Sequence, residues 1–179
     1  KNRKMTKKII AFGASSSKNS INKKLATYTA NQFKNTTVEI LDLNDFEMPV
    51  FSVDKEKDGF PEEAQKFLDK IEEADLLVVS MAEHNGNYTA AFKNILDWAS
   101  RINNKIFQGK NMLLMASSPG ARGGKSVLEI ATDRFPRHDV NLVGTFSLPS
   151  FYENFDEVNG IINEDLKKDL ERIIVSIEI

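Results

Sequence analysis

Short apolar runs alternate with amphipathic stretches along this chain. The apolar runs are of strand length and rich in Ile, Leu, Val and Met, so each predicts a β-strand of a buried sheet. They occupy residues 7–13, 37–43, 75–82, 111–117 and 141–148. In the second run, Val38, Ile40 and Leu41 are expected to face inward.

The stretches between these runs carry apolar residues at the spacing of one helix face. They lie within 20–34, from Pro61 through Ile71, within 89–102 and 124–135, and from about 163 onward. Strands alternating with helices predict an α/β domain of three layers, in which helices cover both faces of an open parallel sheet. For five strands we expect the flavodoxin-like order 2-1-3-4-5, although periodicity alone does not establish it.

Composition narrows the possible functions. No repeat or linker divides the 179 residues, so we expect one domain over 1–179 that begins with a basic tail over 1–6. The 24 Lys and Arg against 26 Asp and Glu argue against nucleic-acid binding. The chain has no cysteine, which excludes disulfides, thiolate metal sites and cysteine nucleophiles. It also lacks a membrane-length apolar run and a secretory signal, so we expect a cytoplasmic protein with no membrane partner.

Three polar loops follow the first, third and fourth predicted strands. In the expected strand order these strand ends meet at one crevice, where ligands of such sheets bind. The loops are 15–22 (SSSKNSIN), 83–88 (EHNGNY) and 117–124 (SSPGARGG). Their convergence favours a ligand site over unrelated surface loops.

The first loop leads hydroxyl side chains into a helix start, where free N–H groups and the helix dipole favour a phosphate. The equally weighted alternative is that Ser20 is only an N-cap. In the second loop, Gly86 can adopt a positive φ and let the backbone approach a flat ligand. The glycines of the third loop leave N–H groups free to cradle a ring carbonyl. An ordinary turn and a flexible loop are the alternatives for these two.

Two other phosphate motifs do not fit. A Rossmann fingerprint should follow the first strand, but Gly13 has no glycine partner before Gly59. The segment 119–126 (PGARGGKS) is similar to a P-loop, but Pro119 stands where the first glycine is required.

The loop residues resemble the NADPH-dependent FMN reductases, a flavodoxin-like family that includes chromate, quinone and azo-dye reductases. The family's G-S-x-R-x-x-S-x-N loop is similar to 14–22, and its S-x-G-x-x-G-G loop to 118–124. Its P-E-Y-N-x-S/G and L-K-N-A-I-D-W segments are similar to 82–86 and 92–98, the most specific match. The resemblance covers nearly the whole chain. Ser17 departs from it by replacing the usual arginine, which weakens the electrostatics of phosphate binding.

The resemblance implies one bound FMN that carries the redox chemistry, with NADPH or NADH as co-substrate. No side chain is then assigned as catalytic, and no metal is expected. The acceptor would be a small molecule such as a quinone, free flavin, azo compound or metal oxyanion, and the protein a homodimer or homotetramer. The alternative function is a flavodoxin-type electron carrier that docks onto protein partners.

The resemblance also assigns site residues. The phosphate would be held by Ser15, Ser17, Ser20, Ile21 and Asn22. The flavin ring would lie against Ala82, Glu83, His84, Asn85, Gly86, Ser117, Ser118, Gly120, Gly123 and Gly124. Arg122 and His84 are candidates for substrate contact, and His84 could change charge beside the ring.

Several large side chains leave alternatives open. Trp98 is expected in the core or at a subunit interface rather than on a cofactor. His138 has no partners at metal-ligand spacing. The aromatic residues that follow the fifth strand either close the core or line an acceptor pocket or dimer contact; they are Phe146, Phe151, Tyr152 and Phe155.

Overall fold

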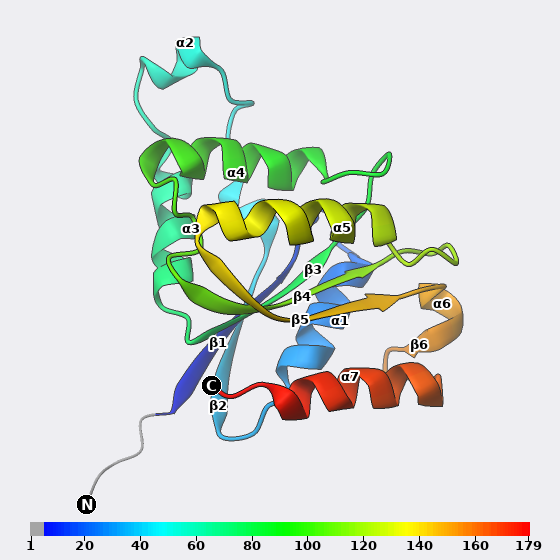
Figure 1. Cartoon of the computed structure of the whole chain (residues 1–179). Helices are drawn as coiled ribbons and strands as arrows, with labels where there is room; N and C mark the ends of the chain where they lie inside the picture. The colour runs from blue at the N-terminus through cyan, green and yellow to red at the C-terminus, as the bar shows by residue number, and fades with distance from the viewer. Residues whose placement is uncertain (1–5) are drawn as a thin grey trace, which may run out of the picture.

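The computed structural model describes residues 6–179, so the predicted basic tail lies, except for Thr6, outside the described residues. A central sheet runs between two layers of helices (Figure 1). Its strands are β1 (Lys7–Gly13), β2 (Thr36–Leu41), β3 (Leu76–Met81), β4 (Lys110–Ser117) and β5 (Val140–Leu148).

The predicted strand order is confirmed. The sheet has the order β2-β1-β3-β4-β5, and each neighbouring pair is parallel. Successive strands are added toward one edge of the sheet up to β2 and toward the other edge from β3 onward. The boundary between β1 and β3 is therefore the switch point at which such sheets bind ligands.

Five longer helices pack on the sheet. They are α1 (Ile21–Ala30), α3 (Glu62–Glu72), α4 (Ala90–Ile102), α5 (Lys125–Arg134) and α7 (Glu164–Ser176). Helices α1 and α7 cover one face, and α3, α4 and α5 cover the other (Figure 1). The first helix ends at Ala30, within the predicted range 20–34. The Asn31 side-chain amide donates to the Thr27 carbonyl at its end, and Asn35 turns the chain with φ 57°.

Short elements that periodicity could not predict fill the connections. They are η1 (Leu43–Phe46), α2 (Val53–Glu56), η2 (Phe135–His138), α6 (Phe151–Asn154), β6 (Phe155–Asp156) and β7 (Gly160–Ile161). The last two pair as an antiparallel hairpin, the β6–β7 hairpin.

Alternate residues of the central strands enter two separate cores. In β1, Ile10 and Phe12 face α3, α4 and α5, whereas Ile9 and Ala11 face α1 and α7. All four are fully buried, as expected for a parallel sheet covered on both faces. In β2, at the sheet edge, Leu41 is buried while Val38 and Ile40 are only half-buried.

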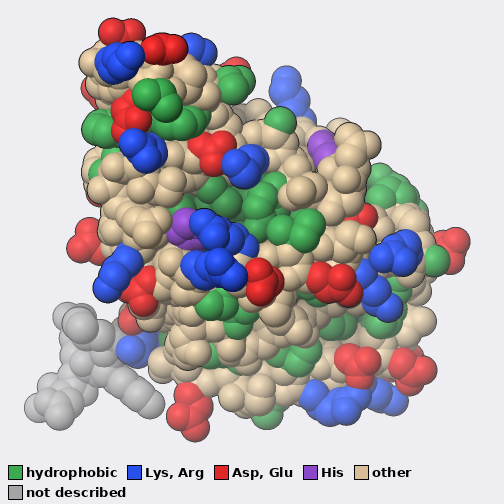
Figure 2. Space-filling view, turned by 45° about the horizontal axis from the view of Figure 1, so that its top comes forward, with side chains coloured by type: hydrophobic (Ala, Val, Ile, Leu, Met, Phe, Trp, Pro, Cys, Tyr) green, Lys and Arg blue, Asp and Glu red, His purple; other side chains and the backbone are tan. Residues whose placement is uncertain are grey.

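Trp98 lies in the core, which is one of the two locations expected from the sequence. It is 1% exposed, and its Nε1 donates to the Pro49 carbonyl at 2.8 Å. Asn94, one turn earlier on α4, donates to the Met48 carbonyl at 3.1 Å and accepts from the Phe51 N–H at 2.9 Å. This part of the K-N-x-x-D-W segment therefore fixes the chain between η1 and α2. The lobe that carries α2 projects at the top of Figures 1 and 2 and shows hydrophobic side chains among charged ones.

None of the helices in residues 6–179 is long and apolar enough to cross a membrane.

Candidate functional site

The three predicted loops meet at the carboxyl edge of the sheet, and hydrogen bonds tie them to one another. Thr89 Oγ1 donates to the Ala14 carbonyl at 2.8 Å, which joins the second loop to the first. Asn22 Nδ2 donates to the Ser117 carbonyl at 3.1 Å, which joins the first loop to the third. The structure therefore brings together segments that lie about one hundred residues apart in the sequence.

The first loop places the N-terminus of α1 directly against the sheet. A Cβ on Gly13 would lie 2.2 Å from the Lys23 nitrogen, so only glycine allows this approach of helix and strand. Ser20 is the N-cap of α1, and its Oγ accepts from the Lys23 N–H at 3.1 Å. The N–H groups of Ile21 and Asn22 precede the first internal bond of the helix and remain available to an anion.

The serines of this loop divide into two groups. Ser15 and Ser20 are buried, at 8% and 6% exposure, whereas Ser17 is exposed. The Ser17 N–H donates to Ser15 Oγ at 3.1 Å, and the Ser20 N–H donates to the Ser17 carbonyl. The loop is thus a compact turn with hydroxyls at its rim.

The Asn22 side chain joins the ends of β3 and β4 rather than pointing outward. It is 2% exposed. Its Oδ1 accepts from Ser80 Oγ at 2.7 Å and from the Ser117 N–H at 3.0 Å. Because both ends of the amide are bonded within the protein, only the Asn22 backbone N–H is left for a phosphate.

The second loop is a tight two-residue hairpin turn. His84 and Asn87 form an isolated antiparallel bridge, and their backbones exchange hydrogen bonds of 3.0 and 3.1 Å. Asn85 and Gly86 between them have φ values of 51° and 73°, the left-handed pair that an Asn-Gly turn favours. A Cβ on Gly86 would meet nothing within 4 Å, so the backbone at the turn faces open space. His84 and Asn85 are exposed, and Ala82 is buried.

Glu83 connects the second loop to the helix that follows the third. Its Oε2 accepts from the Val127 N–H in the first turn of α5 at 2.8 Å. A carboxylate at a helix N-terminus is stabilised by the helix dipole. The predicted ring contact of Glu83 is therefore left to its backbone.

The third loop turns sharply through its glycines. Gly123 and Gly124 have φ values of 59° and 71°, and Gly124 begins α5 as its N-cap. A Cβ on Gly123 would lie 2.5 Å from Ser147 Oγ. Ser117 Oγ donates to the Leu148 carbonyl, and Ser118 Oγ to the Gly120 carbonyl, at 2.8 and 3.2 Å.

Arg122 lies exposed on this third loop. Its Nη2 donates to Ser126 Oγ at 3.3 Å.

Three residues that support the first loop were not predicted from the sequence. Thr89 is 3% exposed and caps α4 while it binds Ala14. Asn44 donates to the Ser16 carbonyl at 3.0 Å. Asp42 pairs with Lys23 at 2.6 Å, and this partner, together with the Asn44 N–H, lowers the pKa of the Asp42 carboxyl to about 2. Their only sequence signal is that Asp42 and Asn44 follow a strand and Thr89 precedes a helix.

The aromatic residues after β5 mostly close the core. Phe146 and Phe151 are 6% and 3% exposed, and Phe151 stacks on Phe155 with ring centroids 4.7 Å apart. Tyr152 is the exception, at 72% exposure. His138 is buried and its Nδ1 lies 2.9 Å from the Asn104 carbonyl. Within residues 6–179, no group of acidic or histidine side chains has the arrangement of a metal site.

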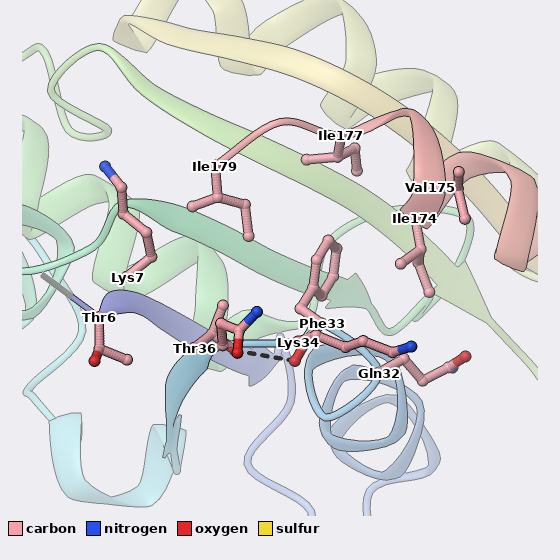
Figure 3. Close-up of a pocket in the computed structure, with 11 residues that line it drawn as sticks. Thr6, Lys7, Gln32, Phe33, Lys34, Thr36, Ile174, Val175, Ile177 and Ile179 are labelled. Carbon is pink, nitrogen blue, oxygen red and sulfur yellow. Dashed lines mark hydrogen bonds between the residues drawn. The ribbon is translucent and has the colours of Figure 1, made fainter. Parts of the chain in front are cut away.

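A cavity of about 810 Å³ lies at the opposite, amino edge of the sheet (Figure 3). It is formed by the start of β1, the turn after α1 and the C-terminal end of α7. Phe33, Ile174, Ile177 and Ile179 supply apolar walls. This cavity contains none of the predicted site residues.

Comparison with known proteins connects the loops to a family. The sequence model of the family described as NADPH-dependent FMN reductase matches residues 7–153. The chain is 31% identical over 157 residues to the uncharacterized protein MG342 homolog of Mycoplasma pneumoniae, covering 85% of this chain and 93% of that protein. It is 28% identical over 146 residues to an NADPH:quinone oxidoreductase of Arabidopsis thaliana, covering 79% and 72%.

Solved structures share the fold. The flavoenzyme NAD(P)H:(acceptor) oxidoreductase FerB from Paracoccus denitrificans superposes with a TM-score of 0.74 at 22% identity. The match covers 95% of this chain and 94% of that one.

Proposed function

We propose that this chain, which belongs to the NADPH-dependent FMN reductase family, binds FMN at the crevice between its three loops and passes electrons from NADPH or NADH to a small acceptor. The observation that carries the proposal is the hydrogen bonding that links loops 15–22, 83–88 and 117–124 at the switch point of the sheet. One bond joins two loops directly, and the other two run through the flanking residues Ala14, Thr89 and Val127. Such a junction holds a ligand on preorganised backbone rather than on mobile side chains.

The phosphate of FMN fits the start of α1. Gly13 brings the helix N-terminus to the sheet, and Ser15, Ser17 and Ser20 supply hydroxyls beside the free N–H groups of Ile21 and Asn22. A helix N-terminus favours an anion without a countercharge. This arrangement supports phosphate binding although Ser17 stands where the family has arginine.

The flavin ring fits between the second and third loops. The hairpin turn at Asn85 and Gly86 and the open backbone at Gly120 leave room for a flat ring against main-chain groups. When bound, FMN supplies the redox chemistry by accepting a hydride from the nicotinamide and giving electrons to the acceptor. The protein positions the ring, and the hydrogen bond from the Val127 N–H of α5 to Glu83 fixes the second loop relative to the third.

We propose a quinone as the acceptor class and a homodimer or homotetramer as the assembly. The quinone is supported by the name of the Arabidopsis relative. Assembly is supported by the exposed apolar side chains of Val50, Val53 and Phe60, at 75%, 64% and 49% exposure around α2. Exposed apolar side chains that gather on one lobe are typical of a protein contact. Sedimentation equilibrium tests the assembly, and a monomer at all concentrations would refute it.

The test of the function is to load the purified protein with FMN and add NADPH or NADH without oxygen. We expect the yellow colour to bleach with one of the two nucleotides and to return when a quinone is added. FMN should also raise the melting temperature, because it binds only the folded state.

The electron-carrier alternative predicts a different result. A carrier would bind FMN but would not be bleached by either nucleotide, and would need a partner protein to be reduced. Absence of flavin binding would refute both functions.

A further inference from the structure

A second cavity, of about 450 Å³, lies on the flank of α1 that faces the β6–β7 hairpin. Ser20 lines it, so the cavity adjoins the loop proposed to hold the FMN phosphate. Its volume falls within the range of small-ligand sites. We call it the flank cavity.

The flank cavity is positively charged in a chain of net charge −2. Lys18, Lys23 and Lys24 line it, and Glu157 is the one acidic residue among the lining residues. The Lys23 amine is bound to Asp42 at 2.6 Å, on the side of η1. Lys18 and Lys24 are therefore the two cations available to a ligand.

The Lys24 amine is held at present by Glu157 of the β6–β7 hairpin, whose side chain is 75% exposed. Exposed ion pairs are weak, so an anion of higher charge can displace this carboxylate. The pair thus keeps the lysine at the cavity without blocking it.

Two aromatic side chains also line the flank cavity, Tyr28 one turn after Lys24 on α1 and Phe155 of the hairpin. Tyr28 and Phe155 contact each other edge to face, with ring centroids 5.6 Å apart. A Cβ on Gly160 would overlap the Tyr28 ring, so the glycine lets the hairpin lie flat against it. Aromatic walls suit a planar heterocyclic base.

We infer that the flank cavity binds the adenosine end of NADPH, with Lys18 and Lys24 on its 2′-phosphate and the base against Tyr28 and Phe155. The inference rests on the proposed function, because the cavity shares Ser20 with the loop proposed to hold the FMN phosphate. It makes the chain selective for NADPH over NADH through Lys18 of the first loop and Lys24 of α1, and it places the nucleotide's 2′-phosphate there rather than at Arg122.

The direct test uses two probes with the same number of phosphates, adenosine 2′,5′-bisphosphate and adenosine 5′-diphosphate, titrated calorimetrically into the FMN-loaded protein. We expect the 2′,5′-bisphosphate to bind about tenfold more tightly, the value of one charge-assisted contact. Lys18→Ala and Lys24→Ala should each remove most of this preference. Glu157→Gln should strengthen binding of the 2′,5′-bisphosphate several-fold, since it releases Lys24.

Two control variants make the test specific. Lys168→Ala on α7 removes an exposed lysine away from the cavity and should leave both affinities unchanged. Arg122→Ala should also leave the preference unchanged. Equal affinity of the two probes, or loss of the preference in Arg122→Ala alone, would overturn the inference.

The proposed function is tested separately in the same samples, by the bleaching of the flavin with NADPH. If NADPH still bleaches the flavin while the probes bind equally, the flank cavity is refuted and the reductase stands. If the protein takes up no FMN, the proposed function fails, and this inference fails with it.

Discussion

Helix α1 has a buried amide group near each end, and the two amides have opposite surroundings. At the start of the helix, Asn22 is bonded at both amide atoms to the ends of β3 and β4. Just past the other end, the Nε2 atom of Gln32 is buried in the wall of the amino-edge cavity and finds no partner among the described residues. Figure 3 shows this end, with its apolar side chains around the cavity.

The difference shows which edge of the sheet is built for polar ligands. A buried polar group without a partner costs free energy, whereas a paired one holds its neighbours in place. At the carboxyl edge the buried side chains of Asn22, Ser117 and Thr89 are paired, and backbone N–H groups stay free at the loops. The exception there is the Tyr88 hydroxyl, which is buried without a partner among the described residues. The amino edge leaves an amide unpaired beside a larger cavity, whose lining mixes apolar and polar side chains. Cavity size alone would point to the wrong edge.

The largest expected effect tests the phosphate end of this comparison. Ser20→Asp should weaken FMN binding at least ~1000-fold, because a fixed carboxylate would face the phosphate in a poorly solvated site. The fold should survive, since aspartate is a good N-cap. FMN titration followed by fluorescence measures the affinity.

Ser52→Asp is the matched control for that variant. Ser52 caps α2 through the Lys55 N–H at 3.2 Å and lies outside the three loops. The same substitution there should leave FMN affinity unchanged. Tight FMN binding by Ser20→Asp would show that the phosphate lies elsewhere.

The next effect concerns the paired amide. Asn22→Leu keeps the branched shape of the side chain but leaves Ser80 Oγ and both backbone groups of Ser117 without their Asn22 partners. We expect the free energy of unfolding to fall by about 3 kcal/mol, the cost of several buried unpaired groups. Urea denaturation measures it. A loss below about 1 kcal/mol would mean that the amide is not a structural clamp.

The unpaired amide should respond in the opposite direction. Gln32→Met removes a buried donor that has no partner among the described residues and keeps the length of the side chain. We expect the free energy of unfolding to rise by about 1 kcal/mol. Run beside Asn22→Leu in the same denaturation experiment, it tests the contrast between the two ends of α1 directly. Destabilisation by Gln32→Met would show that the Gln32 amide is satisfied in solution.

Features with a local signal in the sequence were predicted, whereas bonds between distant residues were not. The strands, their order and the convergence of the three loops were predictable, because apolar runs and turn residues are local signals that the parallel α/β architecture combines in few ways. The Ser20 cap and the positive φ of Gly86 were predictable for the same reason.

The side-chain bonds of the site were not predictable. Asn22 bonds to residues 58 and 95 positions away, and Glu83 to one 44 positions away. These distances in sequence leave no periodic signal, so the sequence assigned both residues to the cofactor site without predicting these bonds. In the structure their side chains hold the loops together. The β6–β7 hairpin, with two residues in each strand, is likewise too short for a pattern.

The smallest expected effect is a pH dependence at the carboxyl edge. Asp42 has its pKa lowered from 3.8 to about 2, chiefly by the hydrogen bond from Lys23. A carboxyl with a lowered pKa stabilises the folded state above its unfolded pKa, and this contribution is lost as pH falls toward the folded pKa. Since the Asp42 and Lys23 side chains are each 34% exposed, screening reduces the contribution to about 1 kcal/mol or less.

The parent protein should therefore be more stable than Asp42→Asn at neutral pH, and the difference in the free energy of unfolding should vanish between about pH 4 and pH 2. Urea denaturation across this range measures it, with Asp54→Asn, at the exposed pair with Lys57, as the control. A difference that stays constant down to about pH 2 would mean that the charge of the Asp42 carboxylate is not the source of the stabilisation.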